Sequence, residues 1–273
     1  MDPLFIFLIV LALIIISLLF LLCLQTSGRK TSAMEGLMIA HRGLHDDIIP
    51  ENSLAAFRAA AEKGYGLELD IRLNKEGKVI VFHDDNLKRV TGVDKKTAEA
   101  DRDDMQNLRL KGTSERIPYF REVLDQIDGR VPILVEFKPG KNMEELCRKA
   151  EELLGDYKGE YFIQSFDPRV LIWYRKNRPD ILRGQLSEFF HIHGTKIPRI
   201  TEFILRNLLF GFLSRPDFIA YNLEDIKRAL GLRLCMKIYH PKLLLWVIRN
   251  GSQLEQAKSL GALPIFEMMS FTD

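Results

Sequence analysis

The chain has 273 residues, a formal net charge of +2 and a hydrophobic content of 47%. This length suits one enzyme-sized barrel with a short appendage, and the small net charge excludes a nucleic-acid binder that relies on a basic surface. The cysteines are Cys23, Cys147 and Cys235, far apart and without metal-type spacing, so no disulfide framework is expected, which is typical of a reducing compartment.

An uncharged apolar stretch runs from Leu4 to Leu24 near the start of the chain. Its length of about 20 residues is enough to cross about 30 Å of hydrocarbon. A signal peptide is the alternative, but such a peptide carries a basic region before a shorter apolar core, whereas only the charge of Asp2 precedes this one. We therefore predict an uncleaved single-pass membrane helix within residues 1–24.

The rest of the chain is expected to form a short flexible linker over residues 25–36 and one domain over residues 37–273. Arg29 and Lys30 follow the apolar span and no basic residue precedes it, so the positive-inside bias places the domain in the cytoplasm. The chain has no internal repeat or low-complexity segment, and no obligate protein partner is evident.

Strand-length apolar runs alternate with helical patterns through this domain. The runs lie at residues 37–40, 64–73, 79–84, 131–138, 161–166, 181–187, 217–222 and 243–248. Helical patterns lie at residues 54–63, 117–127, 143–154, 168–176, 200–213, 223–232 and 252–260. Eight strands with intervening helices favour an α/β fold of the TIM (β/α)8 barrel type over an open sheet. The polar, irregular stretch at about residues 85–119 is expected as a small insertion after the third strand.

The run from Gly64 to Leu73 has the clearest pattern, because apolar and charged residues alternate strictly along it. Its charged face carries Glu68, Asp70 and Arg72. Alone, the run would indicate a half-buried antiparallel strand with a polar face in water. Because other runs also end in ionisable residues, we expect these charges to point into the mouth of the barrel, where such folds place their sites.

Three carboxylates are candidates for a metal site, namely Glu68, Asp70 and Glu136. Hard divalent cations such as Mg²⁺ or Ca²⁺ prefer oxygen ligands of this kind. In the alternative, Glu68 and Asp70 pair with Arg72 and Lys138 in a structural ion network, and the spacing of the residues does not decide between the two.

Two histidines, His41 and His83, each end an apolar run on either side of the charged strand. A pair of imidazoles suits the removal of one proton and the donation of another near neutral pH. A zinc site is the competing interpretation, but it would usually recruit more His or Cys residues. Arg42 and Lys138 supply fixed positive charge of the kind that binds a phosphate.

These residues belong to motifs that follow one another in a set order between about residues 37 and 250. The motifs are His41-Arg42-Gly43, Pro50-Glu51-Asn52-Ser53, Glu68-x-Asp70, His83-Asp84, Glu136-x-Lys138 and Ser165-Phe166. The ordered set resembles the glycerophosphodiester phosphodiesterase family, and the segments Leu87-x-Arg89-x-Thr91-Gly92 and Ile117-Pro118 resemble its linking segments.

The resemblance implies a TIM barrel with an insertion after the third strand and a role for each matching residue. A divalent metal, Mg²⁺ or Ca²⁺, would be held by Glu68, Asp70 and Glu136, and His41 and His83 would be the acid and base. Arg42 and Lys138 would contact the phosphate, and Glu51 would support the site. The pattern departs from the family near its end, where Trp246-Val247-Ile248-Arg249 stands in place of Trp-Thr-Val-Asn and Gly261-Ala262-Leu263 in place of Gly-x-Asp. We still expect Trp246 to line the substrate pocket.

The expected activity is hydrolysis of glycerophosphodiesters to an alcohol and glycerol 3-phosphate, and the resemblance favours attack by the substrate's own glycerol hydroxyl through a cyclic phosphate. One alternative is a lysophospholipase D-type activity on lysolipids of the bilayer. Another is a catalytically silent, membrane-bound barrel that only binds a ligand.

A very apolar stretch from Ile200 to Leu213 lies outside these motifs. It is too short to span a membrane. Because all-round apolar helices are usually core, we expect a buried barrel helix. In the alternative, the stretch lies in the membrane interface and brings the barrel mouth to the bilayer.

Overall fold

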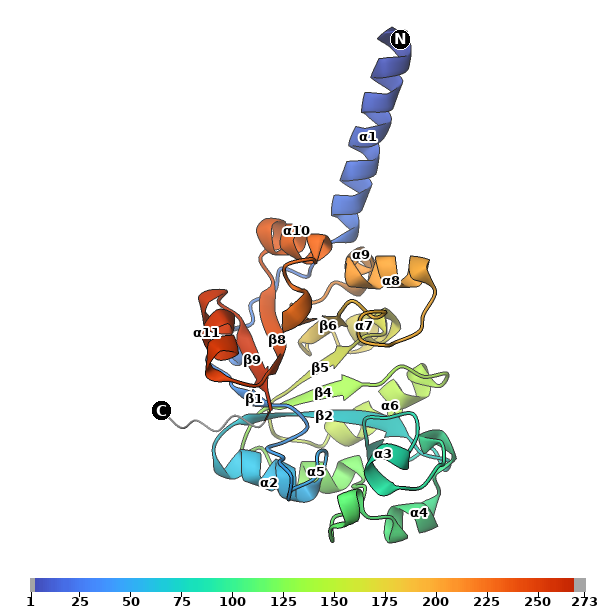
Figure 1. The fold of residues 1–273 in the computed structure, drawn as a ribbon, viewed down its shortest axis with the longest axis vertical. Helices are drawn as coiled ribbons and strands as arrows, with labels where there is room; N and C mark the ends of the chain where they lie inside the picture. Colours follow the sequence, from blue (N-terminus) through green and yellow to red (C-terminus); the bar gives the residue numbers. More distant parts are fainter. Residues whose placement is uncertain (1–2, 268–273) are drawn as a thin grey trace.

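The structure is a computed structural model that describes residues 3–267. It consists of a barrel with one long helix projecting from its side (Figure 1). The expected membrane segment (residues 1–24) and domain (residues 37–273) each extend past these limits, and residues 1–2 and 268–273 lie outside the described residues.

Eight parallel strands close the barrel, because β1 pairs with both β2 and β9. The barrel strands are β1 (Ile39–Ala40), β2 (Gly66–Leu73), β4 (Ile133–Phe137), β5 (Tyr161–Ser165), β6 (Arg183–Ser187), β7 (Phe218–Asn222), β8 (Lys242–Ile248) and β9 (Leu263–Phe266). The predicted TIM barrel is confirmed.

Two strands differ from the expected set. The third strand of the chain, β3 (Val79–Val81), pairs antiparallel with β2 and is therefore not a barrel strand. The tight turn between them, closed by the Asn74 N–H donating to the Lys78 carbonyl, is too short for a parallel crossover. The eighth barrel strand is instead β9, which follows the last helix and was not expected.

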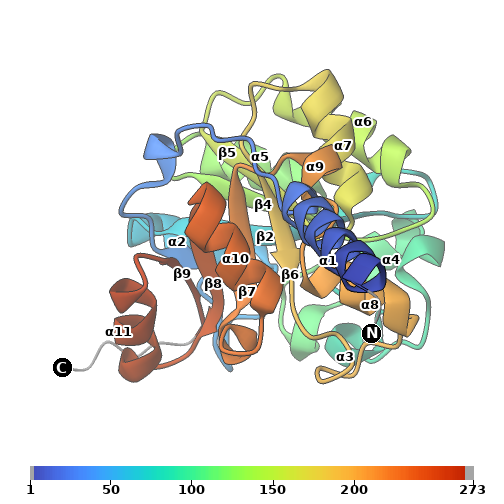
Figure 2. The ribbon, with the colours of Figure 1, turned by 90° about the horizontal axis from the view of Figure 1, so that it is seen from above.

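Helices cover the outside of the barrel in a (β/α) order (Figures 1 and 2). They are α2 (Leu54–Glu62), α5 (Phe120–Ile127), α6 (Met143–Leu154), α7 (Pro168–Asn177), α8 (Arg199–Arg206), α9 (Gly211–Ser214), α10 (Leu230–Tyr239) and α11 (Gly251–Ser259). The helix expected at 223–232 is wrong in position, because residues 223–225 form a 3-10 turn and α10 begins only at Leu230.

The expected buried helix over Ile200–Leu213 is also wrong. The chain breaks it into α8 and α9 at Leu208, which has a left-handed backbone with φ of 60°. Ile200 is 66% exposed and Phe203 is 42% exposed, so these helices present apolar side chains on the surface.

The insertion follows β3, as expected, and has a small core of its own. It contains α3 (Lys88–Thr91) and α4 (Arg102–Asn107) with short 3-10 turns between them and the barrel. Leu87, Val90 and Met105 are among the buried side chains that pack together there.

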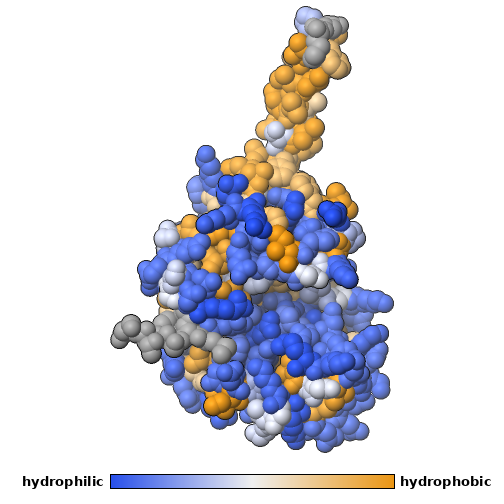
Figure 3. Space-filling model, viewed as in Figure 1, coloured by the Kyte–Doolittle hydropathy of each residue, from blue (hydrophilic) through white to orange (hydrophobic). Residues whose placement is uncertain are grey.

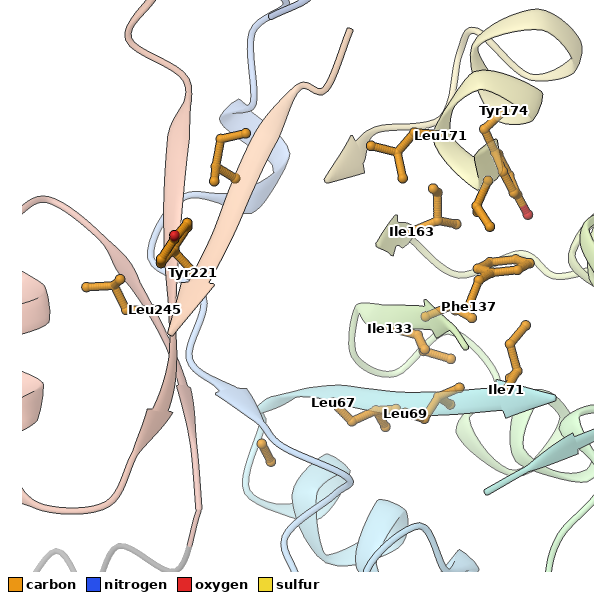
Figure 4. Close-up of a cluster of buried hydrophobic side chains, with 14 of the residues drawn as sticks. Leu67, Leu69, Ile71, Ile133, Phe137, Ile163, Leu171, Tyr174, Tyr221 and Leu245 are labelled. Atoms are coloured by element: carbon orange, nitrogen blue, oxygen red, sulfur yellow. The ribbon is translucent and has the colours of Figure 1, made fainter. Parts of the chain in front are cut away.

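Strand alternation divides the main core into an outer and an inner layer. On β2, Leu67, Leu69 and Ile71 belong to the apolar layer that also contains Leu171 and Tyr174 of the outer helix α7 (Figure 4). Inside the barrel, Leu134, Phe218 and their neighbours form a second apolar cluster. Because successive side chains of a strand point to opposite faces, burying the leucines of β2 outward directs Glu68 and Asp70 inward.

The N-terminal helix α1 (Pro3–Cys23) has 21 residues and is long and apolar enough to cross a membrane, with none of its residues buried. The chain packs onto the barrel directly after it. Leu24 is 1% exposed and belongs to the outer core, and the Tyr239 hydroxyl donates to the Leu21 carbonyl at 2.9 Å. The segment expected as a linker, residues 25–36, contains buried Thr26 and Met34, and Met34 joins the inner cluster.

Close packing inside the barrel gives a test of this arrangement. A Cβ atom on Gly184 of β6 would lie 1.9 Å from Cε2 of the buried Phe218 ring, so Gly184→Ala should destabilise the fold by about 2 kcal/mol or more. Gly251→Ala, at an open position that starts α11, should change stability by less than about 0.5 kcal/mol. Thermal unfolding of both variants in detergent measures the difference, and equal midpoints would contradict the packing described here.

Candidate active site

Three buried carboxylates meet at the carboxyl ends of β2 and β4. Asp70 lies directly opposite Glu136 in the parallel register, and Glu68 precedes Asp70 by two residues on the same face. Each offers an oxygen within 4.8 Å of those of the other two, and all three residues are buried. The structure therefore brings together the three residues that the sequence singled out as metal ligands.

Their electrostatics are dominated by burial and by one another. Burial, Asp70 and Glu136 together raise the pKa of Glu68 well above its ordinary value. Burial alone would raise the pKa of Asp70 too, but the charge of Lys138 and of other nearby cationic groups holds it well below its usual range. All three carboxylates can be charged together only if positive charge lies beside them. Such a site favours a bound cation.

Lys138 partly supplies that compensation. Its Nζ lies 2.9 Å from Asp70 Oδ1 and 2.5 Å from Glu136 Oε1. Arg72 does not join this cluster, because its Nε and Nη2 donate to the His83 carbonyl. Of the structural ion network considered from the sequence, only the Lys138 part is present.

The donor set fits a hard divalent cation. All its protein ligands are carboxylate oxygens, and among the described residues the buried Glu68 Oε1 has no hydrogen-bond partner. A buried carboxylate oxygen without a donor is costly unless another positive group satisfies it. Mg²⁺ and Ca²⁺ are ions that prefer this chemistry.

The His41-Arg42-Gly43 motif turns the chain sharply at the end of β1. Arg42 has φ of 55°, and its backbone N–H donates to Glu68 Oε2 at 3.0 Å. Gly43 has φ of 79°, and a Cβ there would lie 2.8 Å from the Cβ of Ala56 in α2. Glycine is therefore required for α2 to approach the strand end this closely.

The next motif, Glu51-Asn52-Ser53, braces the site from the start of α2. Ser53 caps the helix by accepting a hydrogen bond from the Ala56 N–H. Asn52 Nδ2 donates to Asp70 Oδ2 at 2.8 Å. Glu51 accepts from Arg42 Nη1 at 2.6 Å and from two nitrogens of Arg89 at 2.7 Å, so it holds the Arg42 side chain between the motifs.

The two imidazoles are held in the same way. His41 Nδ1 lies 2.5 Å from Glu267 Oε1, and His83 Nδ1 lies 2.6 Å from Asp84 Oδ1. A carboxylate on Nδ1 favours a proton there and leaves Nε2 for proton exchange with a substrate. His41 Nε2 is 3.9 Å from Glu68 Oε2, and the N–H of Phe82, just before His83, donates to the Asp70 carbonyl at 2.9 Å, so both histidines lie beside the strand that carries Glu68 and Asp70.

His41 is the more deeply placed of the two rings. Its side chain is 12% exposed, against 33% for His83. Burial and the neighbouring charge of Arg42 lower the pKa of His41 from 6.5 to about 4. Its imidazole is therefore neutral near pH 7, the form that accepts a proton.

Aromatic side chains pack together at the ends of β5, β6 and β8. The Trp246 ring at the end of β8 packs edge-on against Phe166, with ring centroids 5.8 Å apart, and Phe166 packs against Phe190 at 5.6 Å. The Trp246 Nε1 is buried without a hydrogen-bond partner among the described residues. This position, on the inner face near the mouth, is compatible with the expected pocket-lining role.

Sequence reasoning gave no role to three residues that hold others in the site. Glu267 directly follows β9, so it was overlooked together with that strand, although it is the partner of His41. Arg89 links Glu51 to Asp84 from the insertion, and its Nε donates to Asp84 Oδ2 at 2.6 Å. Asp84 directly follows His83, and that adjacency was the available signal for its role.

The fold and the site together define an enzyme-type barrel with two histidines, Arg42 and Lys138 around buried carboxylates at the carboxyl ends of its strands. Residues 41–191, more than half of the chain, match the family described as the glycerophosphoryl diester phosphodiesterase family. The chain belongs to this family and is a phosphoric diester hydrolase.

Individual relatives agree with this assignment. A glycerophosphodiester phosphodiesterase of Caldanaerobacter subterraneus subsp. tengcongensis is 31% identical over 57% of this chain and 68% of its own. The human lysophospholipase D GDPD1 is 34% identical over 49% of this chain but only 45% of its own length. A phosphodiesterase of Oleispira antarctica, solved in complex with the product sn-glycerol-3-phosphate, superposes with a TM-score of 0.70 at 23% identity over 86% of this chain and 94% of that one, a likeness of fold.

The ion pairs of Glu51 predict a pH-dependent contribution to stability. Burial would raise the pKa of Glu51, but Arg89 and Arg42 outweigh it and lower the pKa from 4.5 to about 2. Because the folded-state pKa is depressed, this stabilisation is present above about pH 4.5 and is lost as the pH falls towards 2. Glu51→Gln should therefore lower the unfolding free energy by on the order of 2 kcal/mol at pH 7 and by much less near pH 3.

Denaturant unfolding at the two pH values measures this difference. Glu99→Gln, which removes an exposed carboxylate that pairs with the exposed Lys96, serves as the matched control and should have little effect at either pH. A loss in Glu51→Gln that is the same at both pH values would show that the charge of Glu51 is not what stabilises the fold.

Proposed function

We propose that this chain hydrolyses glycerophosphodiesters to an alcohol and glycerol 3-phosphate, with His41 and His83 as its proton-transfer pair. One observation carries the proposal. Both histidines lie beside the strand that carries Glu68 and Asp70 of the buried carboxylate cluster, and the Nδ1 atom of each contacts the carboxylate of another residue. A barrel that only binds a ligand has no need for two imidazoles prepared in this way.

In the proposed reaction, a neutral imidazole removes a proton from the attacking hydroxyl, which is either water or the glycerol hydroxyl of the substrate. The new P–O bond forms as the P–O bond to the alcohol breaks, and the second imidazole donates a proton to the departing oxygen. The lowered pKa of His41 favours it as the base, and His83, nearer the surface, then protonates the leaving alcohol. When the attacking group is the glycerol hydroxyl, water opens the resulting cyclic phosphate.

Glu68, Asp70 and Glu136 are the residues proposed to hold a divalent cation, Mg²⁺ or Ca²⁺. Bound there, the cation would supply positive charge that offsets the phosphoryl oxygens. Arg42 and Lys138 stand beside the same carboxylates and are proposed to orient the phosphate, while Trp246 contacts the rest of the substrate.

A lysolipid is a second candidate substrate. It is favoured by the likeness to relatives named lysophospholipase D and by the apolar helix α1, which we propose is retained as a membrane anchor. Leu24 is part of the folded core. Cleavage by a signal peptidase near this residue would disrupt that packing, which favours an anchor that is retained. Comparing turnover of glycerophosphocholine with that of lysophosphatidylcholine, which differ only in the acyl chain, separates the two substrates.

The histidine pair gives a direct kinetic prediction. His41→Ala and His83→Ala should each lower kcat by about 100-fold or more, because each removes one proton-transfer group. His240→Asn is the matched control, because His240 is an exposed histidine with a left-handed backbone that asparagine tolerates. Release of glycerol 3-phosphate, coupled to a phosphatase, measures turnover. Folded variants that keep near-parent kcat would contradict the assignment, and a parent without turnover on any phosphodiester would favour the binding-only barrel.

The carboxylate cluster predicts dependence on a divalent cation. A chelator should abolish turnover and Mg²⁺ or Ca²⁺ should restore it. Glu136→Gln should raise the half-saturating cation concentration by at least about 10-fold, because it removes a charged ligand. Glu255→Gln, at an exposed carboxylate on α11, should leave that concentration unchanged. Full activity in the chelator would rule out the metal role of the cluster.

A further inference from the structure

Exposed apolar side chains gather on one part of the barrel. Outside α1, ten large apolar side chains of the described residues are exposed, and six of these lie on only three helices. They are Ile200 and Phe203 of α8, Phe212 and Leu213 of α9, and Leu230 and Ile238 of α10, which together we call the α8–α10 face. Scattered exposed apolar residues are ordinary, whereas a concentration of them marks a surface that contacts something.

The three helices surround the base of α1 (Figures 1 and 2). Gly211 of α9 lies so close to the chain leaving α1 that a Cβ there would be 2.7 Å from the Cys23 carbonyl oxygen. At the end of α10, Tyr239 donates to the Leu21 carbonyl. The start of α10 adjoins the end of α8, because the Gly231 N–H donates to Asn207 Oδ1. Figure 3 shows apolar surface where α1 meets the barrel, beside hydrophilic residues.

The charges around this face are mostly basic. Arg199, Arg233 and Lys237 are exposed on α8 and α10, and the guanidinium of Arg206 lies over the Phe203 ring, 5.7 Å from its centroid. Of the acidic residues in the same stretch, Glu202, Asp217 and Asp225 are buried and only Glu224 is exposed. A surface that combines apolar side chains with basic ones suits the headgroup region of an anionic bilayer.

We propose that the α8–α10 face lies on the surface of the bilayer that α1 crosses, with its apolar side chains at the boundary between headgroups and acyl chains. The proposal rests on α1 being a retained membrane anchor. A bilayer is favoured over a second copy of the chain because α1 and the face are continuous. No free linker separates them, so an α1 that spans the membrane holds α8, α9 and α10 at its surface.

This docking would fix the position of the active-site mouth relative to the bilayer surface. The chain from β6 to α8 forms part of the rim, and Ser187 at the end of β6 donates to the Leu205 carbonyl at 3.0 Å. On the same rim, His191 Nδ1 lies 2.6 Å from Glu202 Oε2 in α8. A face seated on the bilayer therefore holds the β6 side of the mouth next to the lipid surface and keeps the barrel from pivoting on its anchor.

The test uses the full chain reconstituted in vesicles of phosphatidylcholine and phosphatidylglycerol, with and without bromine on the acyl chains, placed both near the glycerol and near the chain ends. Bromine quenches tryptophan fluorescence only over short distances. A tryptophan is placed in turn in the anchor (Leu11→Trp), on the face (Phe203→Trp) and on the insertion (Val93→Trp). Val93 is also exposed and follows α3, which lies far from α1 (Figure 1). The emission of the native Trp173 and Trp246, measured in the parent, is subtracted.

Phe203→Trp should lose about half of its emission in brominated vesicles, as Leu11→Trp should, while Val93→Trp should lose almost none. Phe212→Trp repeats the test should Phe203→Trp fail to fold. If Leu11→Trp is quenched but Phe203→Trp is quenched no more than Val93→Trp, the docking of the face is wrong and the membrane anchor remains supported. If Leu11→Trp is not quenched, both the docking and the anchor are wrong. Neither result bears on turnover of a soluble glycerophosphodiester. Replacing phosphatidylglycerol by phosphatidylcholine should weaken the quenching of the face probe, and an unchanged value would contradict the part given to its basic side chains.

Discussion

Three carboxylates held close together and buried from water are the constraint on which the rest of the site depends. Glu68, Asp70 and Glu136 are brought together by strand register, and burial removes the water that would otherwise screen their repulsion. Lys138 and Arg42 offset part of that charge. The remaining negative charge destabilises the fold unless another positive group lies beside the carboxylates. A phosphodiester, which is itself an anion, would need the same positive group in order to bind there.

The second feature of the site is that its reactive groups do not stand alone. Each imidazole is oriented by a carboxylate, and Arg42 is oriented by Glu51, which Arg89 holds in turn. These contacts join the ends of β1 and β9 to the start of α2 and to the insertion. Through Arg89, the insertion after β3 is therefore joined to the candidate site.

Local pattern predicted the centre of the site better than its borders. Strict alternation along β2 was enough to direct Glu68 and Asp70 inward, because the face of a strand depends only on sequence parity. The eighth strand was misplaced because the apolar run of β3 looks like a barrel strand, and only the short turn before it shows that it pairs antiparallel. β9 has four residues and contains Pro264, so it gives a weak signal, and Glu267 was missed with it. The composition of residues 200–213 could not show which side of α8 the barrel covers, since that depends on the break at Leu208.

The account as a whole stands on a cation at the carboxylate cluster, and anomalous X-ray scattering from crystals grown with Mn²⁺ tests this most directly, independently of turnover. We predict one strong anomalous peak bonded to oxygens of Glu68, Asp70 and Glu136 at about 2.0–2.6 Å, with Lys138 Nζ displaced from between the last two. A cluster without a peak, with Lys138 still bridging Asp70 and Glu136, would contradict the account and identify the cluster as a structural ion network.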